Sequence, residues 1–274
     1  MRYLFVLGFC CLCLSGFGHG DIHTRIEILN AEIKNHRDSL DLYYQRGELL
    51  LLHGEYRAAV RDLRRLEKKS ASKRVYFLIA KAFHHLGSFE KSDRYLQRIV
   101  DPYFFDANIY HLLARNYECR KDYERAALIY QKIIDSSHVV RPESYLDLSN
   151  LYLLQNKPEL AIGILNVGIN EKGYLPVLYQ PLIALYEQTA DFTAAVAVMD
   201  HIVDLSKRKE FALYRRAILL EKLGLDSAGQ RDLIDAHKLI LALPPSAQNQ
   251  LAVKNLKREI LRRCEISYLD QTQQ

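Results

Sequence analysis

Residues 110–133 read YHLLARNYECRKDYERAALIYQKI, and this stretch decides the fold. Apolar residues recur every three or four positions on both sides of a short polar segment, Glu118 to Asp122. This spacing places each apolar set on one face of a helix, and the polar segment is long enough to form the turn of a helical hairpin. Ala114 and Ala126 allow the two helices to approach closely. Neither helix could bury its apolar face alone, so the hairpin requires neighbours.

The same hairpin pattern recurs along the chain. The turn residue before each second helix marks one hairpin, and the markers are Gly54, Gly87, Lys121, Asn156, Ala190 and Gly224. Successive markers are 33, 34, 35, 34 and 34 residues apart. Self-similarity at this period is typical of a solenoid of stacked helix pairs.

These repeats resemble the tetratricopeptide repeat family over residues 40 to 243. The first helix of each repeat begins with a large residue: Tyr43, Tyr76, Tyr110, Tyr145, Tyr179 and Leu213. Four residues later comes a position that the family keeps small: Gly47, Ala80, Ala114, Ser149, Ile183 and Ala217. The second helix has its own small position: Ala59, Ser92, Ala126, Ala161, Ala195 and Gly229. Ile183 departs from the pattern, as do Pro158 and Asp226 where the family has an aromatic residue, and the chain has no Trp.

The resemblance implies an all-α solenoid with a concave groove lined by the first helices. We expect six helix-turn-helix repeats over residues 39–243, with an N-terminal capping helix over 21–38 and a C-terminal capping helix over 244–267. Ile22, Ile26, Leu29 and Ile33 give the first cap its apolar face. The second cap is expected to bury Leu251, Leu256, Ile260 and Leu261, and residues 268–274 to form a disordered tail. No boundary interrupts the repeats, so one elongated domain is predicted.

The N-terminus has the pattern of a secretory signal peptide over residues 1–20. A short basic start is followed by an apolar run from Leu4 to Leu14 and by small residues at Gly18 and Gly20. We expect cleavage before Asp21 and a periplasmic or secreted protein with no membrane span in the mature chain. Attachment to a membrane through the N-terminus or a lipid is the alternative. The apolar run is shorter than the roughly 20 residues that a membrane span requires, which disfavours a membrane anchor. Bulky residues directly precede Cys10 and Cys13, where lipid attachment requires a small residue.

Cleavage would leave Cys119 and Cys264 as the remaining cysteines. They lie about eight helices apart in the predicted array, so no disulfide is expected. A chain without disulfides or glycosylation sequons suits a bacterial envelope.

A softer joint is predicted between repeats four and five. Gly163, Gly168 and Gly173 occupy or follow the second helix of repeat four, and Pro181 falls inside the next helix. Proline and glycine weaken helix interiors, so the joint could kink or act as a hinge. The alternative is that the glycines allow close contact between helices.

No residue pattern supports an enzyme, a metal site or a cofactor. The phosphate-loop, zinc-protease and nucleophile-elbow motifs are missing from the sequence. A metal site from His84, His85, His111 and Cys119 would need further ligands in register, which the sequence does not indicate.

The net charge of +5, or +4 without Arg2, is too small to indicate a nucleic-acid partner. The densest basic segment is a helix with six cations, and we interpret it as a solvated outward face: Arg57, Arg61, Arg64, Arg65, Lys68 and Lys69.

The predicted function is therefore recognition of a protein or peptide by a monomer. The groove lining is taken from positions one and five after the large residue of the first helices, and His84 and Glu118 extend the same face. The residues predicted to line the groove are Tyr44, Glu48, Phe77, Lys81, His84, His111, Arg115, Leu146, Asn150 and Tyr214. Aromatic anchors beside Lys81 and Arg115 favour a segment with an apolar side chain and a carboxylate. Two alternatives remain open: a structural accessory of an envelope assembly or secretion machine, and a regulatory subunit of an exported hydrolase.

Overall fold

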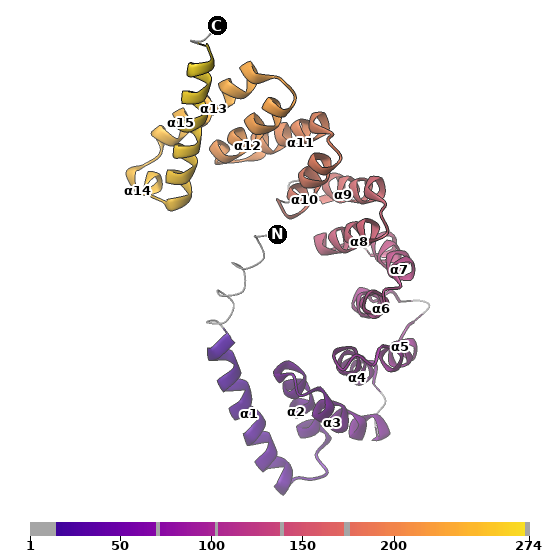
Figure 1. The fold of residues 1–274 in the computed structure, drawn as a ribbon. Coiled ribbons are helices and arrows are strands. Elements are labelled where there is room, and N and C mark those ends of the chain that lie inside the picture. Colours follow the sequence, from indigo (N-terminus) through magenta and orange to yellow (C-terminus); the bar gives the residue numbers. More distant parts are fainter. Residues whose placement is uncertain (1–14, 70–71, 102–103, 138–139, 173–175, 272–274) are drawn as a thin grey trace. The chain divides into compact units, whose positions relative to one another are not determined.

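The computed structural model describes residues 15–69, 72–101, 104–137, 140–172 and 176–271, and regular structure in these ranges is helical throughout (Figure 1). The predicted signal peptide lies outside the described residues except for positions 15–20, which belong to the first helix. The chain divides into two compact units, unit 1 (residues 1–140) and unit 2 (residues 141–274). This division differs from the single domain that the sequence predicts, because a regular period reports each hairpin but not how contacts cluster among hairpins.

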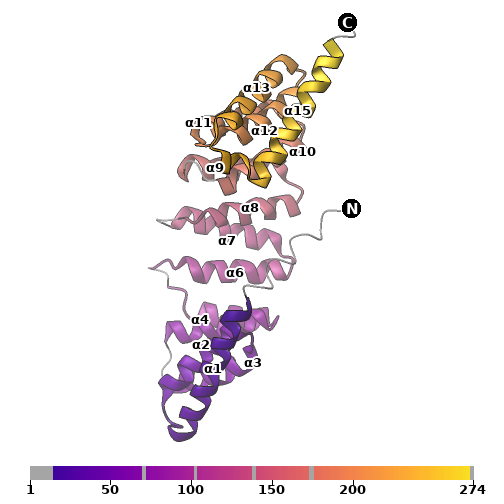
Figure 2. The same ribbon diagram turned by 90° about the vertical axis from the view of Figure 1, so that its left-hand side faces the viewer.

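Unit 1 contains an N-terminal helix and three helix pairs that follow one another in chain order (Figure 2). Its helices are α1 (Ser15–Asn35), α2 (Leu40–His53), α3 (Tyr56–Lys69), α4 (Lys73–His85), α5 (Phe89–Gln97), α6 (Ala107–Cys119) and α7 (Tyr123–Ser136). Unit 2 contains three further pairs and two closing helices. These are α8 (Pro142–Leu154), α9 (Pro158–Lys172), α10 (Pro176–Gln188), α11 (Phe192–Leu205), α12 (Lys209–Lys222), α13 (Asp226–Ala242), α14 (Pro245–Gln248) and α15 (Leu251–Gln271).

All six repeat turns have the same backbone conformation. The six marker residues are the positive-φ residues of the described chain, with φ between 57° and 88°. In each turn the marker donates its N–H to a carbonyl three residues back, and the next residue donates to one five back, as in Glu55 to Leu50 and Asp122 to Tyr117. This is the Schellman ending of a helix, and it satisfies carbonyls that would otherwise be left unpaired.

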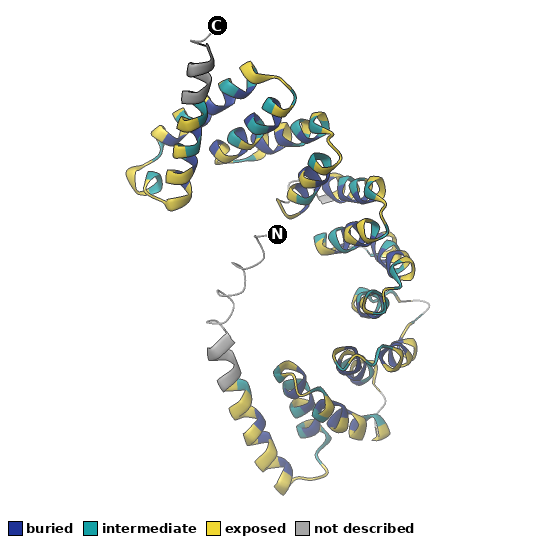
Figure 3. Cartoon of the chain, in the orientation of Figure 1, coloured by how far each residue is buried: buried dark blue, intermediate teal, exposed yellow. Residues whose placement is uncertain are grey.

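Buried residues occur along the helix pairs of both units (Figure 3), and they include the small positions of the family pattern in all six repeats. A Cβ added at Gly47 would stand 3.0 Å from the Leu63 side chain, and one added at Gly229 would stand 3.1 Å from the Ala217 carbonyl. The two helices of a pair therefore approach too closely for larger side chains. Ile183 is also buried, at 1% exposure, so this repeat accepts a larger residue at the small position.

The N-terminal helix α1 buries three of the four residues predicted for its apolar face, and the fourth, Ile22, is half-buried. Ile26, Leu29 and Ile33 are buried, and α1 packs against α2. The helix begins at Ser15, six residues before the expected start at Asp21.

The C-terminal cap differs from the prediction in its buried face and its length. Val253, Leu256 and Ile260 are buried, and α15 packs on α13, whereas Leu251 is 74% exposed and Leu261 39% exposed. Steps of three and four from Val253 keep these side chains on one face, which excludes Leu251 and Leu261. The helix continues to Gln271 and so includes four residues of the expected disordered tail; residues 272–274 lie outside the described ranges.

The two glycines of α9 have different surroundings. A Cβ on Gly168 would lie 2.7 Å from the Tyr145 ring, whereas one on Gly163 would meet nothing within 4 Å. Gly168 therefore allows close contact between α8 and α9, which is the alternative to a hinge. Pro181 lies inside α10, which continues on both sides of it, and Gly173 lies outside the described residues.

Candidate functional site

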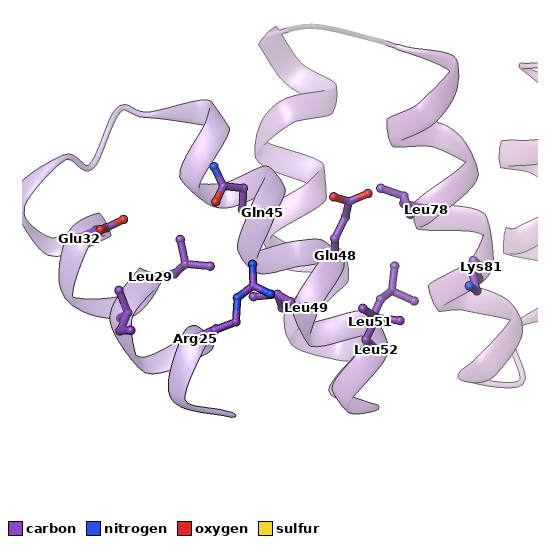
Figure 4. Close-up of a pocket in the computed structure, with 11 residues that line it drawn as sticks. Arg25, Leu29, Glu32, Gln45, Glu48, Leu49, Leu51, Leu52, Leu78 and Lys81 are labelled. Carbon is purple, nitrogen blue, oxygen red and sulfur yellow. The ribbon is translucent and has the colours of Figure 1, made fainter. Parts of the chain in front are cut away.

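A cavity in unit 1 lies between α1, α2 and α4, and we call it the α1–α2–α4 cleft (Figure 4). Its volume is about 550 Å³. The lining residues are Arg25, Ile28, Leu29, Glu32, Gln45, Glu48, Leu49, Leu51, Leu52, Leu78 and Lys81.

Helical periodicity explains why these residues share a cleft. On α1 the lining positions are 25, 28, 29 and 32, and on α2 they include 45, 48, 49 and 52. Both sets step by three, one and three, so each forms a single stripe along its helix. Leu78 and Lys81 add one turn of α4. Three helix faces thus meet around the cleft.

Apolar side chains form the floor of the cleft and continue to its rim. Leu29 and Leu51 are buried, whereas Ile28 is 54% exposed and Leu52 is 64% exposed. Isolated exposed leucines are common, but here two stand on facing helices over an apolar floor. The cleft therefore offers apolar surface to a ligand.

Charged groups stand around this apolar surface with different degrees of pairing. Glu48 accepts a hydrogen bond from the Tyr44 hydroxyl at 2.7 Å and forms an ion pair with Arg74 at 3.0 Å. Burial and the nearby Glu48 carboxylate raise the pKa of Tyr44 to about 12, so this hydroxyl remains a donor. Arg25 reaches from α1 toward α2 (Figure 4). Neither Arg25 nor Lys81 has a salt-bridge partner within the described ranges.

Several predicted groove residues lie in or beside this cleft. Glu48 and Lys81 line it, and Tyr44 is bonded to Glu48. Phe77 on α4 is half-buried. Arg115 on α6 is exposed. The pKa of His85 is lowered mainly by burial, then by the charge of His84, and also by the charges of Lys81 and Arg115. Lys81 and Arg115 therefore both lie near enough to His85 for their charges to act on it.

His84 does not line an open face, and this prediction is corrected. The side chain is 9% exposed, and its Nδ1 lies 2.7 Å from the Asn116 Oδ1 of the next repeat. Asn116 donates to Asp93 at 2.6 Å, and Arg120 donates to the other Asp93 oxygen at 2.6 Å. A buried polar side chain requires such partners, and this network joins α4, α5 and α6.

The remaining predicted groove residues have mixed surroundings. His111 is half-buried, with its ring 5.6 Å from that of Tyr130. In unit 2, Leu146 is half-buried and Asn150 exposed, while Arg263 lies over the Tyr214 ring at 5.9 Å. None of these four residues lines the α1–α2–α4 cleft.

The sequence did not predict the contribution of α1 to the site. It identified the helix as a cap, but four of its residues also form one wall of the cleft. Ile28 was the available signal, because it is a large apolar residue outside the predicted buried face. A capping helix that only covers the end of the repeat stack would not require an apolar residue at position 28.

Other candidate chemistry finds no support in the described residues. No group of three or more His, Cys, Asp and Glu side chains there could hold a metal ion. Cys119 is exposed, Cys264 is half-buried, and neither forms a disulfide within the described residues. Burial raises the pKa of Cys264, which disfavours its reactive thiolate. None of the helices in the described ranges is both long and apolar enough to span a membrane.

Comparison with solved structures identifies the fold. The chain is similar to the C-terminal part of a TPR repeat-containing protein from Cytophaga hutchinsonii, with 14% identity, a TM-score of 0.54, and 80% of this chain and 94% of that chain covered. It is also similar to a tetratricopeptide repeat protein from Parabacteroides merdae, with 16% identity, a TM-score of 0.52, and 90% and 95% covered. No protein-family model and no curated protein matches the sequence. The tetratricopeptide fold that the repeats predict is thus confirmed.

Proposed function

We propose that this protein is a non-enzymatic scaffold that binds a segment of a partner protein in the α1–α2–α4 cleft. One observation carries the proposal: exposed Ile28 and Leu52 face the same cavity as Arg25 and Lys81, whose charges have no described salt bridge. Buried apolar anchors supply most binding energy at protein interfaces, and a cation beside them favours a carboxylate.

The partner segment we expect carries an apolar side chain next to an Asp, a Glu or a terminal carboxylate. The apolar side chain would cover Leu49 and Leu52, and the carboxylate would lie near Lys81. A cavity of about 550 Å³ holds a few side chains but not a folded domain. Glu48 and Glu32 would repel a second carboxylate at the opposite side of the cleft.

Selection from a displayed peptide library, with the purified protein as bait, tests this proposal. Enriched peptides should share an apolar residue beside a carboxylate. Their Kd, measured by fluorescence anisotropy, should rise about tenfold or more, roughly 1.4 kcal/mol, in Lys81→Glu and in Leu52→Asp. Both side chains are exposed, so neither change should unfold the protein.

The matched control is Lys254→Glu on α15, which changes the net charge as Lys81→Glu does. Lys254 is exposed, and α15 does not contribute to the cleft. Peptides that bind equally well to Lys81→Glu and wild type, or that lose affinity equally in Lys254→Glu, would contradict the proposal.

We further propose that the protein is exported and that its mature chain starts at Asp21, which the N-terminal sequence pattern supports. Cleavage there would leave Arg25, Ile28, Leu29 and Glu32 in place, so the cleft would remain complete. The intact mass of protein recovered from the expressing cells checks this start, and a mass that includes residues 1–20 or a lipid would contradict it.

A further inference from the structure

We propose a second binding surface in unit 1, formed by α3 and α5, which takes an acidic segment of a protein partner. This surface is separate from the α1–α2–α4 cleft, to which neither helix contributes. It consists of two neighbouring cavities of about 480 and 190 Å³ that share Arg64. We call it the α3–α5 surface.

The first observation is an imbalance of charge. The two cavities are lined by seven cations: Arg46, Arg61, Arg64, Arg65, Lys91, Arg94 and Arg98. Asp62 is the single carboxylate among the lining residues of both cavities. It is already bound by Arg46, which donates to its two oxygens at 2.6 and 2.8 Å. The other six cations therefore lack a matching set of carboxylates in the cavities.

Helical spacing arranges six of these cations, together with Lys68, in two rows. Residues 61, 64, 65 and 68 on α3 step by three, one and three, and residues 91, 94 and 98 on α5 step by three and four. Each set lies along one face of its helix. All seven residues of the two rows are exposed, so both rows face solvent, whereas Arg46 is half-buried.

The floor beneath the cations is aromatic and buried. Phe83 is 6% exposed and Tyr95 is 9% exposed. Arg64 and Lys91 each lie 5.6 Å from the Phe83 ring centre, and Arg98 lies 5.0 Å from that of Tyr95. Cation–aromatic contacts hold a guanidinium in place while its N–H groups remain available. The donors are therefore positioned before a ligand arrives, which lowers the entropy lost on binding.

One carboxylate near the surface shows how a ligand would be held. Glu67 accepts a hydrogen bond from Arg98 at 2.8 Å and another from the Tyr95 hydroxyl at 3.0 Å. Arg64 and Arg94 lie at the same cavity, and no carboxylate of the described chain pairs with either of them. Arginine binds carboxylates with two parallel hydrogen bonds, so Asp or Glu side chains at two or more positions fit this surface.

Two other anionic partners fit less well. Single-stranded nucleic acid stacks its bases on open aromatic rings, but Phe83 and Tyr95 are buried beneath the cations. A membrane-binding helix needs large apolar side chains among its cations, and none of the described residues of α3 or α5 is an exposed large hydrophobic. An acidic protein segment requires neither feature.

The test uses a fluorescent peptide of about a dozen residues in which Glu alternates with Ser, and a matched peptide with Gln in place of Glu. Binding to the full chain is measured by anisotropy. We expect the Glu peptide alone to bind, and its Kd to rise about tenfold or more in Arg64→Glu/Arg94→Glu. The Glu peptide should bind less tightly as the salt concentration is raised, because the contacts are ionic and exposed.

The control variant is Lys254→Glu/Arg258→Glu on α15, which makes the same change in net charge on exposed residues of unit 2. It should bind the Glu peptide as wild type does. Circular dichroism checks folding, and Arg64→Gln/Arg94→Gln replaces the charge reversal if that variant unfolds. Equal loss in the control, equal binding of the Gln peptide, or tighter and equally Arg64-dependent binding of a single-stranded oligonucleotide would overturn the proposal.

Lys81→Glu separates this surface from the proposed function. The substitution alters the cleft but not the α3–α5 surface, so the Glu peptide should still bind. Failure of the cleft peptides and failure of the Glu peptide are therefore independent results.

Discussion

Units 1 and 2 contain the same repeat but pack their helices with different chemistry. Among the described residues, most cation–aromatic contacts lie in unit 1. From Asp21, unit 1 carries 21 cations and 17 anions, a net charge of +4, whereas unit 2 carries 16 of each. The first two helix pairs of unit 2 pack mainly through apolar side chains and the close contact at Gly168, with hydrogen bonds from Tyr145 to Glu171 and from Asn166 to Tyr186. Both proposed binding surfaces accordingly lie in unit 1.

The same type of polar contact nevertheless occurs within each unit. Arg46 of the first repeat and Arg216 of the sixth each bind an aspartate sixteen residues later with two hydrogen bonds, Asp62 and Asp232. The middle repeats have apolar or aromatic residues at these two positions: Ile79 and Tyr95, Leu113 and Ile129, Leu148 and Ile164, Leu182 and Val198. The third partner differs, since Arg46 also donates to neutral Asn30, whereas Arg216 donates to the carboxylate of Asp200. Hydrogen bonding to Asp232, then to Asp200, raises the pKa of Arg216.

The largest expected effect comes from removing one aspartate at a time. Asp62→Ala leaves Arg46 partly buried with a neutral partner, and we expect unfolding to become easier by about 3 kcal/mol. Asp232→Ala should cost less, about 2 kcal/mol, because Asp200 still neutralises Arg216. Urea unfolding, monitored by hydrogen exchange in peptides from α3 and α13, measures the stability of each unit separately.

The double variant Arg46→Leu/Asp62→Leu is the control for this comparison. It gives the first repeat apolar residues of the kind found in the middle repeats, and its stability should lie within about 1 kcal/mol of wild type. Equal losses in Asp62→Ala and Asp232→Ala would show that the third partner does not distinguish the two units.

The next effect tests close packing in unit 2. Gly168→Ala would place a methyl group against the Tyr145 ring, and we expect a loss of about 1–3 kcal/mol. Gly163→Ala on the same helix meets open space and should gain about 0.5–1 kcal/mol. Thermal melts of both variants measure the difference. The same sign at both positions would show that close contact is not the role of Gly168.

Much of the fold could be predicted because its determinants are local. Each turn and each small position depends on residues within one hairpin, and the sequence shows a similar pattern in every repeat. The burial of His84 could not be predicted, since its partner Asn116 lies 32 residues away. The contribution of α1 to the cleft could not be predicted either. Periodicity shows which face of a helix is buried but not which cavity its other face lines. The two-unit division likewise depends on packing among hairpins.

A smaller effect concerns the turns, which the two units have in common. Lys121 in unit 1 and Ala190 in unit 2 have positive φ, a conformation that costs a residue with a Cβ about 1 kcal/mol. Lys121→Gly and Ala190→Gly should each raise the free energy of unfolding by about 0.5 kcal/mol, after the added flexibility of the unfolded chain is subtracted. Asn156→Gly should gain less, because Asn tolerates this conformation. The Gly54→Ala variant, measured in the same urea series, should be less stable than wild type. Unchanged stability would contradict the idea that positive φ in these turns penalises a residue with a Cβ.

The smallest expected effect is a pH dependence of α4 in unit 1. Burial, then the charges of His84, Lys81 and Arg115, lower the pKa of His85 below 6.5, so folding disfavours its protonated form. The unfolded chain then binds more protons in this range, so the contribution of His85 is present above pH 6.5 and is lost as the pH falls through the folded pKa. The ring stacks on Tyr56 at 4.7 Å, and His85→Gln would keep polarity there without a titratable group. Hydrogen exchange of α4 at pH 7.5 and 5 should show acid-dependent opening that is weaker in His85→Gln than in wild type. An equal pH dependence in the two proteins would assign it to another group.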